Sequence, residues 1–442
     1  MSSSSPKDWD DLSAVKLNER LVRLLTVGLL CATAAPVSAD STLTGSLTQR
    51  GIYDSSPRLA STDTDSVSGY ILEPRANLDF VGERWDVSNG LRLTFPFYDN
   101  DDFNLTEQRY DLTATRALPR GDFSITGTLE RGSTLTNGLV DELDGIINDN
   151  NELIATRRNS AIVRPQWAHQ LTERNQVIIG GSASIVDFED RTFPVDVGDG
   201  RIFDVDAAGQ LSDYRFDGAD ITFQRALSQR TNVFATAAVS RFRADERVLL
   251  TGLSITEEET SNFSRQLQLG VTHAFSPTVS GTFRAGGRIV DSETDITDLL
   301  FETPTQTLED DSSGGVFDAE LNWTPERMQV SLLASRTIAP SGIGQLLEQD
   351  RVSLLIVREL RPGLTARLRA GYIERSRVAG GVPFDREVVR VDPTLRWRFR
   401  EHWAVAAGAR YASVRDANGD ERDGVRLFVN LIYDFSRSPI FR

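Results

Sequence analysis

Residues 423–435 read DGVRLFVNLIYDF, and their strict alternation of apolar and polar side chains decides the fold class. Val425, Leu427 and Val429 share one parity with Leu431, Tyr433 and Phe435, whereas Arg426, Asn430 and Asp434 lie on the other. A period of two residues is typical of a β-strand with two different faces. The same pattern recurs at 279–289, 389–399 and 403–411, and no helical periodicity is apparent after residue 40. The chain is therefore predicted to be all-β.

The connections between these strands alternate between short and long. Short polar turns fall near residues 82–84, 119–121, 172–174, 228–230, 276–277, 325–326, 361–363 and 400–401. Longer segments lie near 54–66, 99–104, 133–151, 189–209, 246–258, 293–311, 339–346, 378–384 and 417–422. The turns define hairpins, and one further strand remains at each end, near 41–53 and 423–435. This spacing predicts a closed, antiparallel, up-and-down transmembrane β-barrel of about 18 strands, with about 16 as the alternative.

Composition excludes several other classes of protein. The 442 residues include 48 Lys and Arg against 64 Asp and Glu, a net charge of −16, and only 39% are hydrophobic. A helical membrane bundle needs apolar runs of about 18 residues, and a nucleic-acid-binding surface must be basic. The single cysteine, Cys31, excludes a disulfide framework and a multi-cysteine metal site.

Residues 1–39 are predicted to be a cleavable signal peptide. A charged segment ends near Arg23, an apolar segment follows over 24–35, and Val37 and Ala39 form a small-residue cleavage pattern. A short N-terminal helix is the alternative. The barrel is accordingly assigned to residues 40–442.

The tryptophans of the barrel region all lie close to short turns. Rings at one end of many strands are typical of the interfacial girdle of an outer-membrane barrel, so we expect the bacterial outer membrane as the location. The predicted girdle consists of Trp85, Trp167, Trp323, Trp397 and Trp403.

Three prolines lie inside predicted strands. Pro74, Pro165 and Pro393 share the outward parity, and each lies on a strand that runs toward a short turn. Proline removes a ladder donor, so a recurring β-bulge is expected to absorb them.

Charged side chains on the inward parity are predicted to line the channel. Most of them should pair across neighbouring strands, and a few should set the field of the pore. Arginines dominate over 364–411, where Asp392 is the only inward acid, so a weak local anion preference is expected. The predicted lining is Glu73, Arg75, Arg284, Arg288, Asp318, Glu320, Arg367, Arg369, Arg390, Asp392, Arg396, Arg398 and Arg410.

The sequence contains only weak candidates for a catalytic or a metal-binding site. His169, His273 and His402 lie beside short turns on the outward parity, so neither an enzyme nor a cofactor is expected. Asp416, Asn418 and Asp420 have the spacing of the first calcium ligands of an EF-hand. However, Glu421 replaces its glycine and Leu427 its closing glutamate, and Asn418-Gly419 is an ordinary hairpin turn. No metal is expected there. Other acidic loops are expected to be solvated, or to bridge to lipopolysaccharide phosphates through divalent cations.

The signal peptide, the strand number, the Thr172-Glu173-Arg174 and Pro325-Glu326-Arg327 turns and the closing strand resemble one family, the β-barrel porins of alphaproteobacterial outer membranes (β-barrel porin 2-like). The resemblance implies an outer-membrane β-barrel protein, and some members are linked with exopolysaccharide export. It also implies that an aromatic of the closing strand, Tyr433 or Phe435, is read by the barrel assembly machinery.

The function predicted from the sequence is passive passage of small hydrophilic solutes. One alternative is an exopolysaccharide secretion conduit. Another is a structural or adhesive barrel without transport, plugged by the 187–209 or the 291–311 segment. The expected partners are outer-membrane lipid and lipopolysaccharide, the assembly machinery, and small solutes or polysaccharide, without nucleic acid.

Overall fold

The computed structural model describes residues 40–57, 66–133, 157–189, 192–196, 202–206, 212–251, 254–298, 306–340, 345–378, 385–416 and 419–441. The predicted signal peptide, residues 1–39, lies outside this part of the chain, as does the long segment 134–156. Among the described residues, no helix has the length and apolar character of a membrane span.

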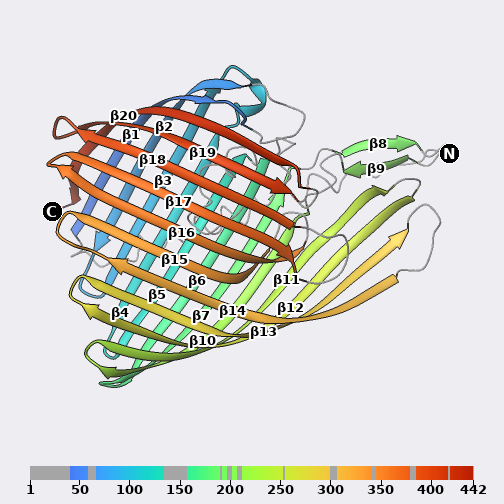
Figure 1. The fold of residues 1–442 in the computed structure, drawn as a ribbon, viewed down its shortest axis with the longest axis horizontal. Helices are drawn as coiled ribbons and strands as arrows, with labels where there is room; N and C mark the ends of the chain where they lie inside the picture. The colour runs from blue at the N-terminus through green and yellow to red at the C-terminus, as the bar shows by residue number, and fades with distance from the viewer. Residues whose placement is uncertain are drawn as a thin grey trace.

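Eighteen strands form one antiparallel sheet that closes on itself, because the first strand pairs with both the second and the last (Figure 1). The predicted fold class and strand number are confirmed. The first half of the sheet contains β1 (Asp40–Asp54), β2 (Val67–Val81), β3 (Trp85–Tyr98), β4 (Glu107–Leu118), β5 (Gly121–Ser133), β6 (Arg157–Thr172), β7 (Asn175–Phe188), β10 (Tyr214–Ser228) and β11 (Thr231–Thr251). The second half contains β12 (Ser254–Ser276), β13 (Val279–Asp298), β14 (Gln306–Trp323), β15 (Met328–Pro340), β16 (Leu346–Arg361), β17 (Leu364–Arg377), β18 (Asp385–Arg398), β19 (Trp403–Asp416) and β20 (Glu421–Phe441).

The two faces of the wall follow the alternation in the sequence. On β18, Arg390 and Asp392 are buried inside the barrel, whereas Val389, Leu395 and Trp397 are exposed on its outer surface. Successive side chains of a strand point to opposite faces, so one face of each strand is apolar and the other polar. This is the reverse of a soluble protein, in which the exposed face is polar.

Three of the short turns are stabilised in the same way, by a hydroxyl side chain at the start of the turn. The side chains of Thr172, Ser228 and Ser276 accept hydrogen bonds from the backbone N–H groups two residues on, at 3.2–3.3 Å. Ser and Thr stabilise tight turns in this way. The strand pairing shifts register at each of these turns, and one further shift lies at the opposite end, between Ala244 and Arg247.

At the opposite end of the barrel, four neighbouring strands are longer than expected. Segments 246–258 and 293–311 were predicted to be loops, and that prediction is wrong for much of them. Here β11–β14 continue as paired strands past the ends of their neighbours, on the right of Figure 1. Their charges resemble those of a solvated loop, but their backbones pair across the hairpins.

The described parts of the two segments that were predicted as plugs do not fill the lumen. Much of segment 291–311 belongs to the wall strands β13 and β14. Within 187–209, β8 (Thr192–Asp196) and β9 (Ile202–Asp206) form a separate hairpin beyond the strand ends (Figure 1).

The three strand prolines cause no bulge, and the expectation of one was wrong. Around Pro74, pairing with β3 stops after Leu72 and resumes at Arg75 in an unchanged register. Pro165 and Pro393 interrupt the ladders to β7 and β19 in the same way. Each proline removes one donor, and the chain keeps its register because neighbouring residues on both sides remain paired.

The closing strand is longer than the sequence indicated. Alternation ends at Phe435, but the β20 backbone continues to Phe441 and pairs Ser438 with Leu43 and Phe441 with Ser41. Register shifts near Leu43 and Ser41 accompany this extension, which explains why the period of two no longer reveals it. Residues 436–441 are therefore part of the strand rather than a free tail.

Candidate functional site: the inner wall of the barrel

The outer surface carries an apolar band that suits lipid. Leu427 and Val429, for example, are 50% and 57% exposed on β20. Trp167, Trp323 and Trp397 are exposed near short turns at one end, and Trp85 and Trp403 are half-buried there. A closed antiparallel barrel with this exterior is the outer-membrane architecture. The protein is an outer-membrane β-barrel.

The histidines lie at the same end, each beside an aromatic ring. His169 stacks on Trp167 with 5.2 Å between ring centroids, and His273 contacts Phe275 at 4.8 Å. The ring of His402 lies 6.2 Å from that of Tyr433. These contacts place the three histidines at the end of the barrel that carries the tryptophans.

On the inner wall, Asp392 of β18 holds two arginines. Its carboxylate accepts a hydrogen bond from Arg390 Nε at 2.7 Å and another from Arg410 Nε at 2.5 Å. All three side chains are largely buried, since none has more than 15% of its area exposed. The group carries net positive charge, because one carboxylate faces two guanidinium groups.

The closure of the barrel brings further charges beside this group. Arg426 of β20 lies opposite Arg410 in the strand ladder and pairs with Asp54 of β1 at 2.6 Å. Next along β1, Arg50 donates to Asn430 at 3.0 Å. Sequence reasoning did not single out these four closing residues, although the inward parity of Arg426 and Asn430 was a usable signal.

The predicted lining residues of β2 also form a pair. Arg75 donates from Nε to Glu73 at 2.7 Å, and Glu73 is buried whereas Arg75 is exposed. Both side chains share the inner face with Arg50, because Glu73 pairs with Thr48 of β1.

A second charged group lies on β13, β14 and β16. Arg284 is 3.4 Å from Asp318 on the neighbouring strand, and Arg288 forms an ion pair with Glu348 of β16. Glu320 accepts a hydrogen bond from Asn322 on its own strand at 2.6 Å.

The remaining predicted lining residues lie toward the short turns. Arg369 is opposite Asp392 and Arg367 is opposite Thr394 in the β17–β18 ladder. Arg396 approaches Asp434 at 3.5 Å, and Arg398 is exposed near the end of β18.

These contacts correct the charge count on β17–β19. From the sequence, Asp392 is the only inward acid on these strands, and pairing with neighbouring strands was expected to leave a positive surplus. Asp434 of β20 now faces Arg396, and Arg426 is matched by Asp54. The positive surplus is therefore smaller than predicted, and the ion pairs around Asp392 form one part of it.

The weak calcium candidate is a hairpin turn in which Asp416 is already engaged. Its carboxylate lies 2.8 Å from Arg422 and 3.8 Å from Arg386. Gly419 has a left-handed φ of +81° and donates its N–H to the Asp416 carbonyl at 2.8 Å. Asn418 lies outside the described residues. The arrangement fits the turn reading of Asn418-Gly419.

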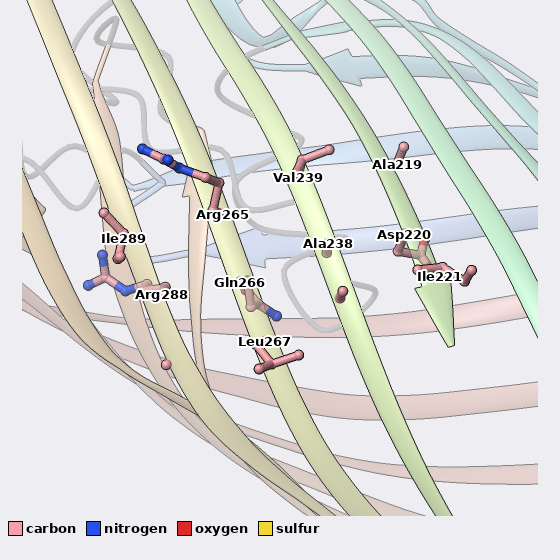
Figure 2. A pocket seen from close by; sticks show the side chains of 12 residues that line it. Ala219, Asp220, Ile221, Ala238, Val239, Arg265, Gln266, Leu267, Arg288 and Ile289 are labelled. Carbon is pink, nitrogen blue, oxygen red and sulfur yellow. The ribbon is translucent and has the colours of Figure 1, made fainter. Parts of the chain in front are cut away.

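A hollow of about 670 Å³ is lined by residues of β10–β13 (Figure 2). Most of its lining residues, including Val239, Leu267 and Ile289, have the lipid-facing parity, and it forms where Ala219 and Ala237 are small. An apolar lining of this kind does not belong to the charged wall described above.

No protein-family model matches the sequence, and a search of the curated proteins found no match. Solved structures resemble the fold at low identity. The ferric yersiniabactin uptake receptor FyuA from Yersinia pestis shares 10% identity over 88% of this chain and 66% of its own, with a TM-score of 0.45. This chain thus spans about two thirds of FyuA. OccAB4 of Acinetobacter baumannii (10% identity, 90% and 98% coverage) and OccK5 of Pseudomonas aeruginosa (13%, 90% and 99%) both have TM-scores of 0.40.

Proposed function

We propose that the protein is a diffusive channel for small hydrophilic solutes across the outer membrane, with a weak preference for anions. The observation that carries the proposal is the charged inner wall, on which Arg390, Asp392 and Arg410 lie behind an apolar exterior. Barrels of 16–18 strands are wide enough to enclose an aqueous interior.

The charge of the wall supports the anion preference. Arginine cannot lose its proton under ordinary conditions, and it binds carboxylate and phosphate oxygens through a planar fork of donors. Around Asp392, two guanidinium groups face one carboxylate, so a passing anion is favoured over a passing cation. Screening at physiological salt, about 8 Å, confines this effect to one side of the bore.

The test is planar-bilayer recording with the refolded barrel, residues 40–442. We expect stepwise ohmic conductance in potassium chloride. Liposome swelling with uncharged sugars of increasing size should then give the size limit. Protein that inserts and shows heat-modifiable mobility, yet carries no current and admits no solute, would contradict the channel function.

A further inference from the structure

The wall of the barrel is incompletely paired between β14 and β15. Their ladder runs from Trp323 opposite Val330 only as far as Phe317 opposite Arg336. Beyond this point β14 continues to Gln306, paired with β13, and β15 continues to Pro340, paired with β16. The sheet therefore divides here into two separately paired edges. We call the division, between residues 306–316 and 337–340, the seam.

The edge formed by β15 and β16 is turned into the lumen. Leu332 and Val352 are exposed on the outer face of these strands, and by alternation Ile338 and Leu346 belong to that same face. Yet Leu346 is only 5% exposed and packs in a cluster with Val290 of the inner face of β13. The other members come from distant parts of the wall: Val186 and Phe188 of β7, Tyr214 of β10, and Phe242 and Ala244 of β11, with Ile338 packed against them.

The outer face of β16 can contact the inner face of β13 only if the edge formed by β15 and β16 lies on the lumen side of β13 and β14. The long-loop ends of β15 and β16, residues 337–340 and 345–350, therefore lie inside the wall formed by β7 and β10–β13. We call them the corner. Their side chains narrow the bore at this level, because strands that are far apart around the barrel contact one another through it.

An ion pair holds the corner in this position. Arg288, on the inner face of β13, reaches past β14 and pairs with Glu348 of the corner. Its side chain is almost fully buried, and it lies against Gly314, where an added Cβ would be 3.1 Å from Nη2. Because Gly314 has no side chain, the Arg288 side chain has room to cross the seam and reach Glu348. Arg336 also lies 3.6 Å from Glu348, but it belongs to β15 beside the corner.

We infer that the corner is a gate of the channel, closed in this structure by the Leu346 cluster and the Arg288–Glu348 pair. In the open arrangement it swings outward and extends the β14–β15 ladder in its present register, which places Gly315 opposite Ile338. The inference rests on the proposed channel function. The two arrangements can be similar in free energy. Opening breaks the apolar contacts and the ion pair, and it forms ladder hydrogen bonds between the edges of β14 and β15.

The first experiment traps the open arrangement with a disulfide. Gly315→Cys and Ile338→Cys are combined with Cys31→Ser, and oxidation is followed by gel mobility after proteolysis between the two positions. A disulfide requires Cα atoms within about 7 Å, so it forms only if the ladder extends. The control pair, Ala319→Cys with Ala334→Cys, lies opposite in the existing ladder and should cross-link without altering conductance.

We expect the Gly315–Ile338 pair to cross-link and the oxidised channel to show a higher steady conductance that a reductant reverses. If the control pair cross-links and the seam pair does not, the gate is overturned. It is equally overturned if the seam pair cross-links in a conducting channel without changing its conductance. Cross-linking in a barrel that never conducts would instead remove the channel function and leave the movement intact.

The second experiment weakens the closed arrangement. Glu348→Gln removes the partner of Arg288 across the seam, and we expect open times at least several-fold longer than in the unaltered protein. The matched control, Asp318→Asn, removes the partner of Arg284 between adjacent strands and does not touch the seam. Equal effects of the two substitutions would overturn the role of the Arg288–Glu348 pair.

Discussion

Asp54 on the first strand and Arg426 on the last are joined by an ion pair of 2.6 Å, with only 7% and 12% of their side chains exposed. The residues are 372 positions apart in the chain, so this contact exists only when the barrel is closed.

Removing one partner of this pair should destabilise the closed barrel. We expect Asp54→Asn to lower the free energy of unfolding by about 3–5 kcal/mol, because it leaves the charge of Arg426 buried without its acid. The measurement is the urea midpoint of the heat-modifiable gel shift. Asp217→Asn is the control, since its partner Arg215 is 3.5 Å away and both are half-exposed, a setting worth about 0–1 kcal/mol. Similar losses in both variants would contradict the prediction.

The turn at Pro362-Gly363 should not tolerate a side chain. Gly363 has a φ of +80°, and an added Cβ would lie 2.9 Å from the carbonyl oxygen of Arg398. We expect Gly363→Ala to cost about 1–3 kcal/mol in unfolding experiments because of backbone strain and this contact. Gly51→Ala, where an added Cβ meets nothing within 4 Å, should stay within about 0.5 kcal/mol of the unaltered protein.

Phe435 should matter for assembly. Its ring is exposed on the outer face, covers Gly45 of β1 and packs edge-to-face on Tyr433 at 5.0 Å. We expect Phe435→Ala to reduce the yield of folded barrel in outer membranes. Deletion of 436–442 should have a smaller effect, because the pairing that it removes lies beyond a register shift. If the deletion alone abolishes assembly, Phe441 is the critical aromatic.

The selectivity of the pore should depend on two arginines. Replacing Arg390 and Arg410 with glutamine leaves Asp392 unbalanced, so the reversal potential should move toward cations at low salt. The shift should nearly vanish at about 1 M salt, where screening acts within about 3 Å. Arg265→Gln, on the outer face beside Asp291, is the control and should have no effect. An unchanged reversal potential in the double variant would place this group outside the conducting path.

Most of the fold could be predicted from the sequence, because each strand repeats one local rule. Alternation at 423–435 and the positions of the short turns suffice for strand number and closure. The extension of β11–β14 could not be predicted, because consecutive charges such as Glu309, Asp310 and Asp311 break the alternation that marks a strand and are typical of a loop.

The site was less predictable for a geometric reason. Parity assigns Leu346 to the lipid-facing side, and only the path of the whole sheet shows that this side is turned inward. The Asp54–Arg426 pair likewise depends on the register of the closing ladder, which is set by strands at opposite ends of the chain.

The prolines of β2, β6 and β18 have a mechanical consequence. Each interrupts the ladder to the following strand at about the same height, without displacing the strands on either side. Like the seam between β14 and β15, these three positions lack ladder hydrogen bonds, so the wall bends more easily there than where its strands are fully paired. Under lateral pressure from the bilayer, the cross-section of the barrel should change by bending at these positions. The short turns at the end of the barrel should keep their spacing.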